Sequence, residues 1–252
     1  MIYPYSKKIS SNYENFIAVC PICEVENTYN RVTDLKTIEP ISFKTVKCFK
    51  CNQNFNINYD TVSEAYQYLI LDVYELKEQK RYMYCILNLA QAMESFLSYS
   101  IRVKLLWQPF KDRVIEGVDE FNSISNQFHN TSKTDTFRNL RSLFFKIYLN
   151  NIDFSSTSKI EDFINKHSTY KKYNPTHTEI EDYPDSNLVN LFLKLNNTKV
   201  PDLRNKVVHK YSYRPTLEEV EECLKETRYI VFRLASQLNI QDNLYYFVNR
   251  NT

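Results

Sequence analysis

Glycine is nearly absent from this chain of 252 residues, which contains only Gly117. Glycine adopts left-handed backbone conformations more readily than any other residue, so its scarcity disfavours an architecture with many tight hairpins. It also excludes the glycine-rich loops with which P-loop and dinucleotide-binding folds hold phosphates. The chain has 43% hydrophobic and 25% charged residues, and this composition favours a helical protein with one substantial core and a small additional domain.

Long apolar runs are missing as well. No stretch approaches the roughly twenty apolar residues of a membrane span, so we expect no membrane partner. The sequence shows no secretory hydrophobic region, and Cys85 and Cys223 stand alone on predicted core faces of helices, which favours the reducing cytoplasm. The formal net charge is only +2, so any contact with nucleic acid is expected to be local.

The other four cysteines form two Cys-x2-Cys pairs, which are Cys20 with Cys23 and Cys48 with Cys51. Two residues between the cysteines let each pair close a tight knuckle that presents both sulfurs to one tetrahedral ion. Four thiolates leave no open coordination position, so the pattern predicts a structural zinc site. Disulfides are the alternative interpretation.

The sequence around these cysteines resembles a zinc ribbon. A strand is predicted over residues 16–19, and Phe55, Ile57 and Tyr59 alternate after the second pair. Knuckles of this kind usually carry glycine after the second cysteine, but Glu24 and Asn52 occupy those places, and asparagine accepts a left-handed conformation more readily than glutamate. We therefore expect residues 1–59 to form a small β domain that zinc stabilises.

Helical patterns fill residues 60–252. A capping box at Thr61–Glu64 predicts a helix that runs toward Gln79, and a second helix is expected over residues 81–107, with Pro109 marking its end. Apolar spacing and capping residues predict the remaining helices, over 113–128, 135–150, 187–195, the segment that follows Pro201, and a last long helix capped by Thr216.

The segment 151–186 is polar and is predicted to be an insertion with at most one short helix, opened by Ser158. His167 and His177 lie in this insertion without a neighbouring ligand at metal spacing. We therefore expect no functional role for either, and we expect His129 to be solvated.

Residues 204–209 read Arg-Asn-Lys-Val-Val-His. On a helical wheel at about 100° per residue with Arg204 at zero, Asn205 and His209 fall near 100° and 140°, where they can act on one ligand. Residues 203–217 contain neither Asp nor Glu, so the exposed side has a positive field suited to a phosphate backbone. The opposite side is predicted to be apolar and comprises Leu203, Val207, Val208 and Tyr211.

This motif, which follows Asp202 and Leu203, resembles the signature of the HEPN superfamily, an Arg-x4-6-His pattern that often has Asn directly after the Arg. The matching residues are Arg204, Asn205 and His209. The segment 87–97, which is rich in alanine and carries Glu94, is similar to the second helix of that family. The resemblance implies a mainly α protein in which a HEPN-like helical bundle follows the small β zinc ribbon.

The same resemblance implies a metal-independent endoribonuclease whose active site forms where two copies meet in a homodimer. In that chemistry the 2′-hydroxyl of RNA attacks the adjacent phosphate. His209 moves protons because its ordinary pKa lies near neutrality, and Arg204 stabilises the charge that gathers on phosphorus. Asn205 would orient the phosphate or the imidazole.

Four further residues are secondary candidates for the active site. Glu94 corresponds to a glutamate near the active centre of the family, and Lys206 and Lys210 add positive charge beside the motif. Tyr211 extends the motif to Arg-x4-His-x-Tyr, a form found in HEPN toxins whose nucleotidyltransferase antitoxin adenylylates the tyrosine. Packing in the core is the alternative role of Tyr211.

The sequence therefore predicts a cytoplasmic RNA-cleaving toxin, or an antiphage or stress effector, regulated by an antitoxin or another protein. Two other classes stay open. A non-cleaving module could use the cationic helix face to bind RNA or a nucleotide, and an interaction module could use the helices only to dimerise and recruit partners. A surface helix in which Arg204 and His209 have no chemical role is a further alternative.

Overall fold

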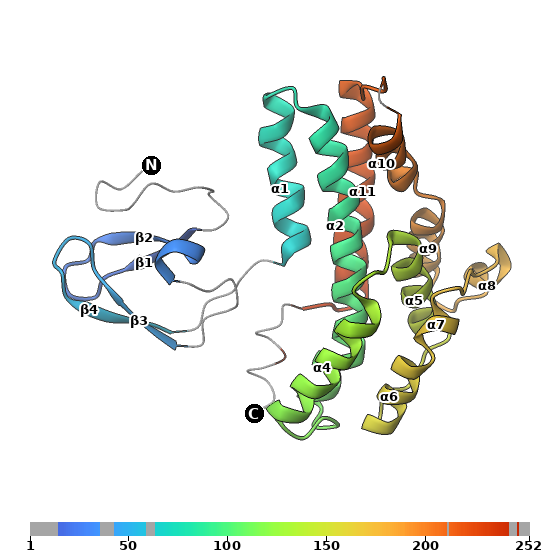
Figure 1. Cartoon of the computed structure of the whole chain (residues 1–252), viewed down its shortest axis with the longest axis horizontal. Coiled ribbons are helices and arrows are strands. Elements are labelled where there is room, and N and C mark those ends of the chain that lie inside the picture. Colours follow the sequence, from blue (N-terminus) through green and yellow to red (C-terminus); the bar gives the residue numbers. More distant parts are fainter. Residues whose placement is uncertain (1–14, 36–42, 59–63, 211, 242–245, 247–252) are drawn as a thin grey trace. The chain divides into compact units, whose positions relative to one another are not determined.

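The computed structural model describes residues 15–35, 43–58, 64–210, 212–241 and 246 (Figure 1). The chain divides into two compact units, residues 1–63 and 64–252, and each has its own hydrophobic core. Tyr59, the predicted capping residues Thr61 to Ser63, and Tyr211 lie outside the described residues. The protein is mainly helical, with a small N-terminal β region.

Two antiparallel hairpins make up the described part of the N-terminal unit. Strand β1 (Asn15–Val19) pairs with β2 (Glu26–Asn30), and β3 (Phe43–Lys47) pairs with β4 (Asn54–Asn58). A π-helical turn, η1 (Arg31–Leu35), follows β2. The strand predicted over residues 16–19 and the alternation of Phe55 and Ile57 are confirmed, because both of these side chains are buried. With Tyr29, Leu35 and Val46 they form a small apolar core.

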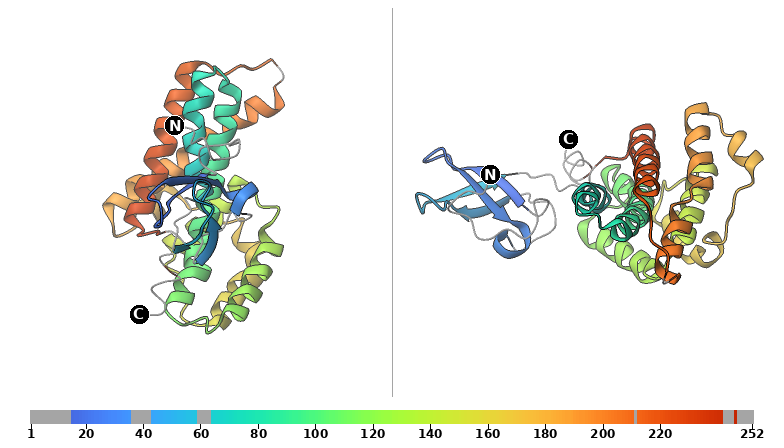
Figure 2. Two further views of the ribbon diagram at one scale, coloured as in Figure 1. Left: turned by 90° about the vertical axis from the view of Figure 1, so that its left-hand side faces the viewer. Right: turned by 90° about the horizontal axis from the view of Figure 1, so that it is seen from above.

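Helix α2 (Tyr82–Arg102) is the centre of the C-terminal unit. It packs against α1 (Ala65–Glu78), α5 (Phe137–Leu149), α10 (Val200–His209) and α11 (Leu217–Gln237). The view from above in Figure 2 looks nearly along α1, α2 and α11, which lie side by side. Eleven residues of α2 are buried, among them Cys85, and Cys223 of α11 is buried too, so the predicted core positions of both isolated cysteines are confirmed.

The prediction that Pro109 ends the second helix is wrong. After α2 the chain continues through a π-helical turn, η2 (Val103–Trp107), into α3 (Gln108–Lys111), and Pro109 lies in the first turn of α3. Proline is tolerated there because the first amides of a helix have no intrahelical acceptor. The other predicted helices are present with shifted ends. Helix α1 begins at Ala65 and is capped by Glu64, and α4 (Val118–Ser132) includes the exposed His129.

The segment 151–186 is more ordered than its polar sequence suggests. It contains α6 (Thr157–Asn165), α7 (His167–Tyr170) and α8 (His177–Glu181), and α9 (Ser186–Asn197) begins at its end. The expectation of at most one short helix is therefore wrong. The buried apolar residues Phe154, Ile160, Phe163, Ile164 and Ile180 join the main core.

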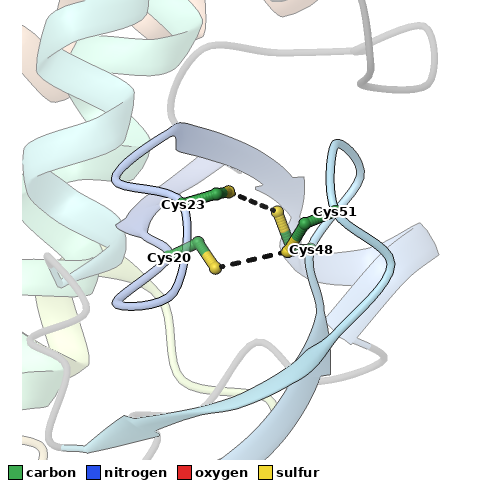
Figure 3. Close-up of side chains that lie close together, drawn as sticks. All are labelled: Cys20, Cys23, Cys48 and Cys51. Carbon is green, nitrogen blue, oxygen red and sulfur yellow. Dashed lines mark hydrogen bonds between the residues drawn. The ribbon is translucent and has the colours of Figure 1, made fainter.

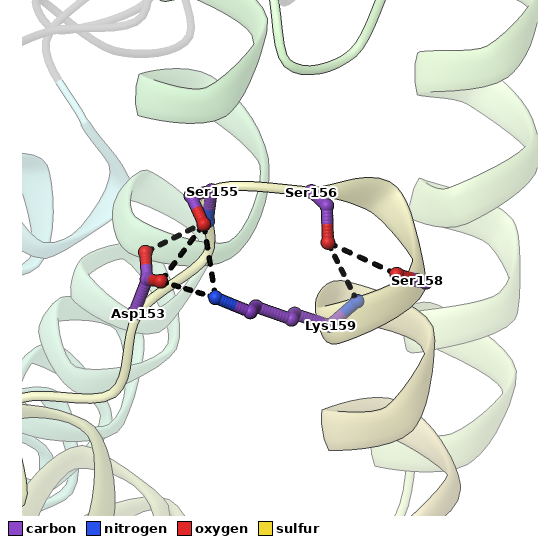
Figure 4. A network of polar contacts seen from close by, with 5 residues as sticks. All are labelled: Asp153, Ser155, Ser156, Ser158 and Lys159. Carbon is purple, nitrogen blue, oxygen red and sulfur yellow. Dashed lines mark hydrogen bonds and ion pairs between the residues drawn. The ribbon is translucent and has the colours of Figure 1, made fainter.

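The polar residues at the start of this segment form helix-capping contacts (Figure 4). The Ser156 hydroxyl accepts a hydrogen bond from the Lys159 amide at 3.4 Å and caps α6, two residues before the predicted Ser158. The Lys159 ammonium pairs with Asp153 and also donates to Ser155. Serine and aspartate favour helix N-termini because their oxygens satisfy free amides, so a polar sequence here indicates short capped helices.

A buried pair connects this segment to the start of α5. The His167 Nε2 lies 2.6 Å from Asp135 Oδ2, and the two side chains are only 2% and 1% exposed. A buried polar group is stable only when it is paired. His167 is therefore a packing residue that binds α7 to the residues preceding α5.

Among the described helices, none has both the length and the apolar character that crossing a membrane requires.

Candidate functional site

The four paired cysteines come together at the ends of the two hairpins (Figure 3). Cys20 Sγ lies 3.8 Å from Cys51 Sγ, Cys23 Sγ lies 3.7 Å from Cys48 Sγ, and all four sulfurs are within 4.8 Å of one another. These distances exceed the length of about 2.05 Å of a disulfide bond. A tetrahedron with metal–sulfur bonds of about 2.3 Å has sulfur–sulfur edges of about 3.8 Å, so the cluster could hold a metal ion.

The two knuckles have the same backbone geometry. In the first, the Glu24 amide donates to the Cys20 carbonyl at 2.9 Å, and in the second, the Asn52 amide donates to the Cys48 carbonyl at 3.1 Å. Glu24 and Asn52 have φ angles of 55° and 60°, so both adopt the left-handed conformation that glycine usually provides. Both cysteine knuckles therefore close tightly without glycine.

Asn27 joins the two knuckles. Its side-chain amide donates to the Val25 carbonyl at 2.8 Å, and its Oδ1 accepts from the Phe49 amide at 2.8 Å. Burial raises the pKa of the Cys23 thiol to about 12. Burial also opposes ionisation of Cys48, but hydrogen bonds from the amides of Cys51 and Lys50 outweigh it and lower the pKa of this thiol to about 6. The backbone amides of the second knuckle thus favour the thiolate form of Cys48.

Helix α10 carries the Arg-Asn-x3-His motif. It begins at Val200 with Pro201 in its first turn, as predicted, and ends at His209. Val207 is buried, whereas Val208 is 43% exposed, so the prediction that Val208 belongs to the buried side is wrong. Because α10 packs mainly on α2, it buries a narrower strip than a helix enclosed on two sides.

A cavity of about 580 Å³ lies among α2, α5, α9 and α10. Three candidate residues line it together, namely Glu94 of α2 with Arg204 and Asn205 of α10. Arg138 and Arg141 of α5 face the same cavity. The polar part of the lining is completed by Thr136, Asn196, Asn197, Thr198 and Asp202.

The cavity is positively charged, because three arginines outnumber the carboxylates of Glu94 and Asp202 in its lining. Burial lowers the pKa of Arg141, and the nearby charge of Arg138 lowers it further. Arg141 donates to the Asn196 carbonyl at 2.8 Å, and Arg204 donates to the Asn205 side-chain oxygen at 3.2 Å. These contacts orient the guanidinium groups, and a bound anion would relieve the repulsion between Arg138 and Arg141.

Glu94 has a clear structural role in this wall. Its Oε1 accepts a hydrogen bond from the Phe137 amide at 3.1 Å, at the first turn of α5. A carboxylate at a helix N-terminus satisfies a free amide and complements the helix dipole. Glu94 therefore connects α2 to α5 at the edge of the cavity.

His209 is not among the residues that line the cavity. It is exposed at the end of α10, about 6 Å along the helix axis from Asn205. Lys206 and Lys210 are exposed as well, and the Lys206 ammonium lies 5.8 Å from the centre of the Tyr213 ring. One copy of the chain thus brings Arg204, Asn205 and Glu94 together and leaves His209 at the surface.

Sequence reasoning missed Arg138 and Arg141. Their spacing of three residues places them on one face of α5, but this pattern is common on solvated helices. Only the packing of α5 against α2 turns that face toward Arg204.

Comparison with models of protein families, with curated proteins and with solved structures finds no match to this chain. Functional inference therefore depends on the chain's own residues and geometry.

Proposed function

We propose that the helical unit is a HEPN-type endoribonuclease that cleaves RNA without a catalytic metal. The observation that carries this proposal is the cavity in which Glu94, Arg204 and Asn205 meet two further arginines. The residues come from separate helices, and the cavity combines guanidinium and amide groups that bind phosphate oxygens. The resemblance of residues 204–209 to the HEPN signature supplies the reaction type.

In the proposed reaction the 2′-hydroxyl of a ribose attacks the neighbouring phosphate, and the bond from phosphorus to the 5′-oxygen breaks. His209 transfers the protons, Arg204 stabilises the developing negative charge, and Asn205 orients the phosphate. The products are a 2′,3′-cyclic phosphate and a free 5′-hydroxyl. Arg138 and Arg141 would hold flanking phosphates.

A homodimer is part of the proposal. Within one chain His209 lies outside the cavity, at the exposed end of α10. A twofold contact near this end would bring the motifs of two copies together, because such a contact uses the same surface on both subunits. The biological setting we propose is a cytoplasmic toxin or an antiphage or stress effector, with an antitoxin or another regulatory protein as its partner.

We propose zinc as the ion of the cysteine cluster, in a structural role. Four soft thiolate ligands favour zinc, and the sulfur spacing fits its tetrahedral coordination. Such an ion would stabilise a unit whose apolar core is small.

A second function has its own supporting observation. Because His209 does not line the cavity, the cavity of one chain presents cations and amides without an imidazole. That arrangement suits a module that binds RNA or a nucleotide without cleaving it.

Cleavage in a metal-free buffer tests the nuclease proposal. Purified wild-type protein is incubated with total RNA and with transfer RNA in excess chelator, and the zinc content of the protein is measured afterwards to show that the cysteine site stayed loaded. We expect RNA fragments that end in a 2′,3′-cyclic phosphate. Intact RNA at high protein concentration would contradict the nuclease and favour the binding module.

The variants for this test are Arg204→Ala and His209→Ala. Loss of the acid–base group is expected to slow cleavage by about 10²- to 10⁴-fold, whereas RNA binding is retained. His129→Ala is the matched control, because His129 is also an exposed histidine in the last turn of a helix. Equal cleavage by His209→Ala and His129→Ala would exclude His209 from the mechanism.

A further inference from the structure

Helix α11 has a second face that is not part of the core. Its core face includes Val220, Ile230 and Leu234, which are fully buried. A different set of side chains recurs every three or four residues and is exposed to solvent. These residues are Lys225, Arg228, Tyr229, Phe232, Arg233 and Ser236.

This exposed face forms one side of a groove of about 600 Å³, and Tyr74 and Lys77 of α1 form the other. Helices α1 and α11 contact each other. Three aromatic side chains of the groove are unusually accessible, with Tyr74, Tyr229 and Phe232 exposed by 37%, 44% and 41%. Grouped aromatic exposure of this kind indicates a surface that binds a partner.

Cationic side chains lie close to two of these rings. The guanidinium carbon of Arg228 lies 5.8 Å from the centre of the Tyr74 ring, and its Nη1 donates to the Tyr74 hydroxyl. The Lys194 ammonium of α9 lies 5.4 Å from the centre of the Tyr229 ring. The first contact orients Arg228 and Tyr74 within the groove, and the second holds the Tyr229 ring from α9, outside the groove lining.

The charge balance of the groove is positive. Four cationic side chains line it and one acidic side chain, Glu221, which pairs with Lys77 at 3.2 Å. The lining therefore carries three more positive charges than negative ones, and these belong to Lys225, Arg228 and Arg233. The complementary partner is a polyanion with flat apolar surfaces.

We propose that this groove binds single-stranded RNA. Bases would stack on Tyr74, Tyr229 and Phe232, and the backbone phosphates would contact the neighbouring lysine and arginines. A stripe from Glu221 to Ser236 spans about 22 Å along the helix, which is long enough for several consecutive nucleotides. In the proposed nuclease, this groove would be a second contact for the RNA substrate. The proposal rests on the nuclease function only in naming RNA as the ligand.

A second copy of the chain fits the groove less well. An isologous contact would place the cationic surface of one subunit, with Lys225, Arg228 and Arg233, against the same cationic surface of the other. Like charges that face each other oppose association. The groove also shares no lining residue with the cavity beside Arg204, so the two surfaces can be tested separately.

The test uses the full chain and a fluorescent ten-residue oligouridylate with 2′-O-methyl groups on every ribose. This probe has no free 2′-hydroxyl, so binding is measured by anisotropy whether or not the protein is a nuclease. We expect Tyr229→Ala and Phe232→Ala each to weaken binding by about tenfold or more. Arg233→Gln should weaken binding and reduce its dependence on salt.

Tyr84→Ala is the matched control, because Tyr84 is 52% exposed on α2 and has the guanidinium of Arg81 at 4.4 Å from its ring centre, outside the groove. This variant should bind the probe as wild type does. Unchanged affinity of Tyr229→Ala and Phe232→Ala, with thermal unfolding as in wild type, would overturn the proposal.

Two further outcomes would also overturn it. One is displacement of the probe by an acidic peptide as effectively as by unlabelled RNA. The other is a loss of self-association in the groove variants without a change in RNA affinity, measured by sedimentation. His209 does not line the groove, so the loss of cleavage in His209→Ala tests the nuclease proposal, whereas the loss of probe binding in Tyr229→Ala and Phe232→Ala tests the groove.

Discussion

The cysteine cluster and the arginine cavity differ in how their residues are brought together. The cluster uses two loops within residues 20–51, and both loops repeat one pattern of hydrogen bonds. The cavity uses residues from α2, α5, α9 and α10, which are far apart in the chain. Local loop geometry therefore forms each half of the first site, and the two halves meet when two neighbouring hairpins pair, whereas the second site requires the packing of four helices.

The largest expected effect concerns the cysteine cluster. Cys48→Ser removes one of four sulfurs, and structural zinc sites contribute about 10–16 kcal/mol to the folding of small units. We expect loss of the bound metal and faster proteolysis within residues 15–58, while the helical circular dichroism signal persists. Mass spectrometry of the metal content provides the measurement.

Cys85→Ala is the control for that experiment, because Cys85 is a buried thiol of the helical core. It should retain one zinc ion per chain. Equal metal content in Cys48→Ser and wild type would show that the cluster is not the zinc site.

The second prediction tests whether the cavity needs two chains. Arg204→Ala and His209→Ala are each expected to be inactive, but an equal mixture should regain roughly a quarter of wild-type cleavage if each active site combines residues of both subunits. Half of the dimers are then mixed, and each mixed dimer has one intact site. Cleavage rates of the mixture, with the separate variants as controls, provide the measurement, and a mixture as inactive as its components would place the site within one chain.

The third prediction concerns the wall of the cavity. His167→Ala removes the ion-pair partner of the buried Asp135 carboxylate, which among the described residues keeps only the hydrogen bond from Asn139, and is expected to reduce the free energy of unfolding by about 3–5 kcal/mol. Urea unfolding measures this change. His177→Ala is the control, because His177 pairs with Glu181 at the surface and its loss should cost at most about 1 kcal/mol.

The smallest effect is expected at the first knuckle. Glu24→Gly removes the side chain from a left-handed position and should stabilise the N-terminal unit by about 1 kcal/mol. Asn52→Gly should have a smaller effect, because asparagine tolerates this conformation. A higher unfolding temperature for Glu24→Gly than for Asn52→Gly would support this reasoning, and the reverse order would contradict it.

The sequence predicted several of the features that depend on short-range geometry. The strand over residues 16–19, the first-turn position of Pro201 and the helix cap at Thr216 are confirmed. Each follows from spacing over a few residues, where backbone sterics and single hydrogen bonds decide the structure.

The features that depend on tertiary packing were predicted less well. The exposure of Val208 and the burial of His167 depend on which helices lie nearby, and hydrophobic periodicity does not contain that information. Arg138 and Arg141 were missed for the same reason, since only the packing of α5 on α2 directs them toward Arg204. The HEPN assignment, the nuclease activity and the dimer stay predictions.

The hydrogen bond from the Phe137 amide to Glu94 has a consequence for any ligand of the arginine cavity. Because this hydrogen bond holds the first turn of α5 against α2, the helix that carries Arg138 and Arg141 is already positioned before a ligand arrives. The entropic cost of ordering this helix is met during folding, so ligand binding has a smaller entropic cost and a higher affinity.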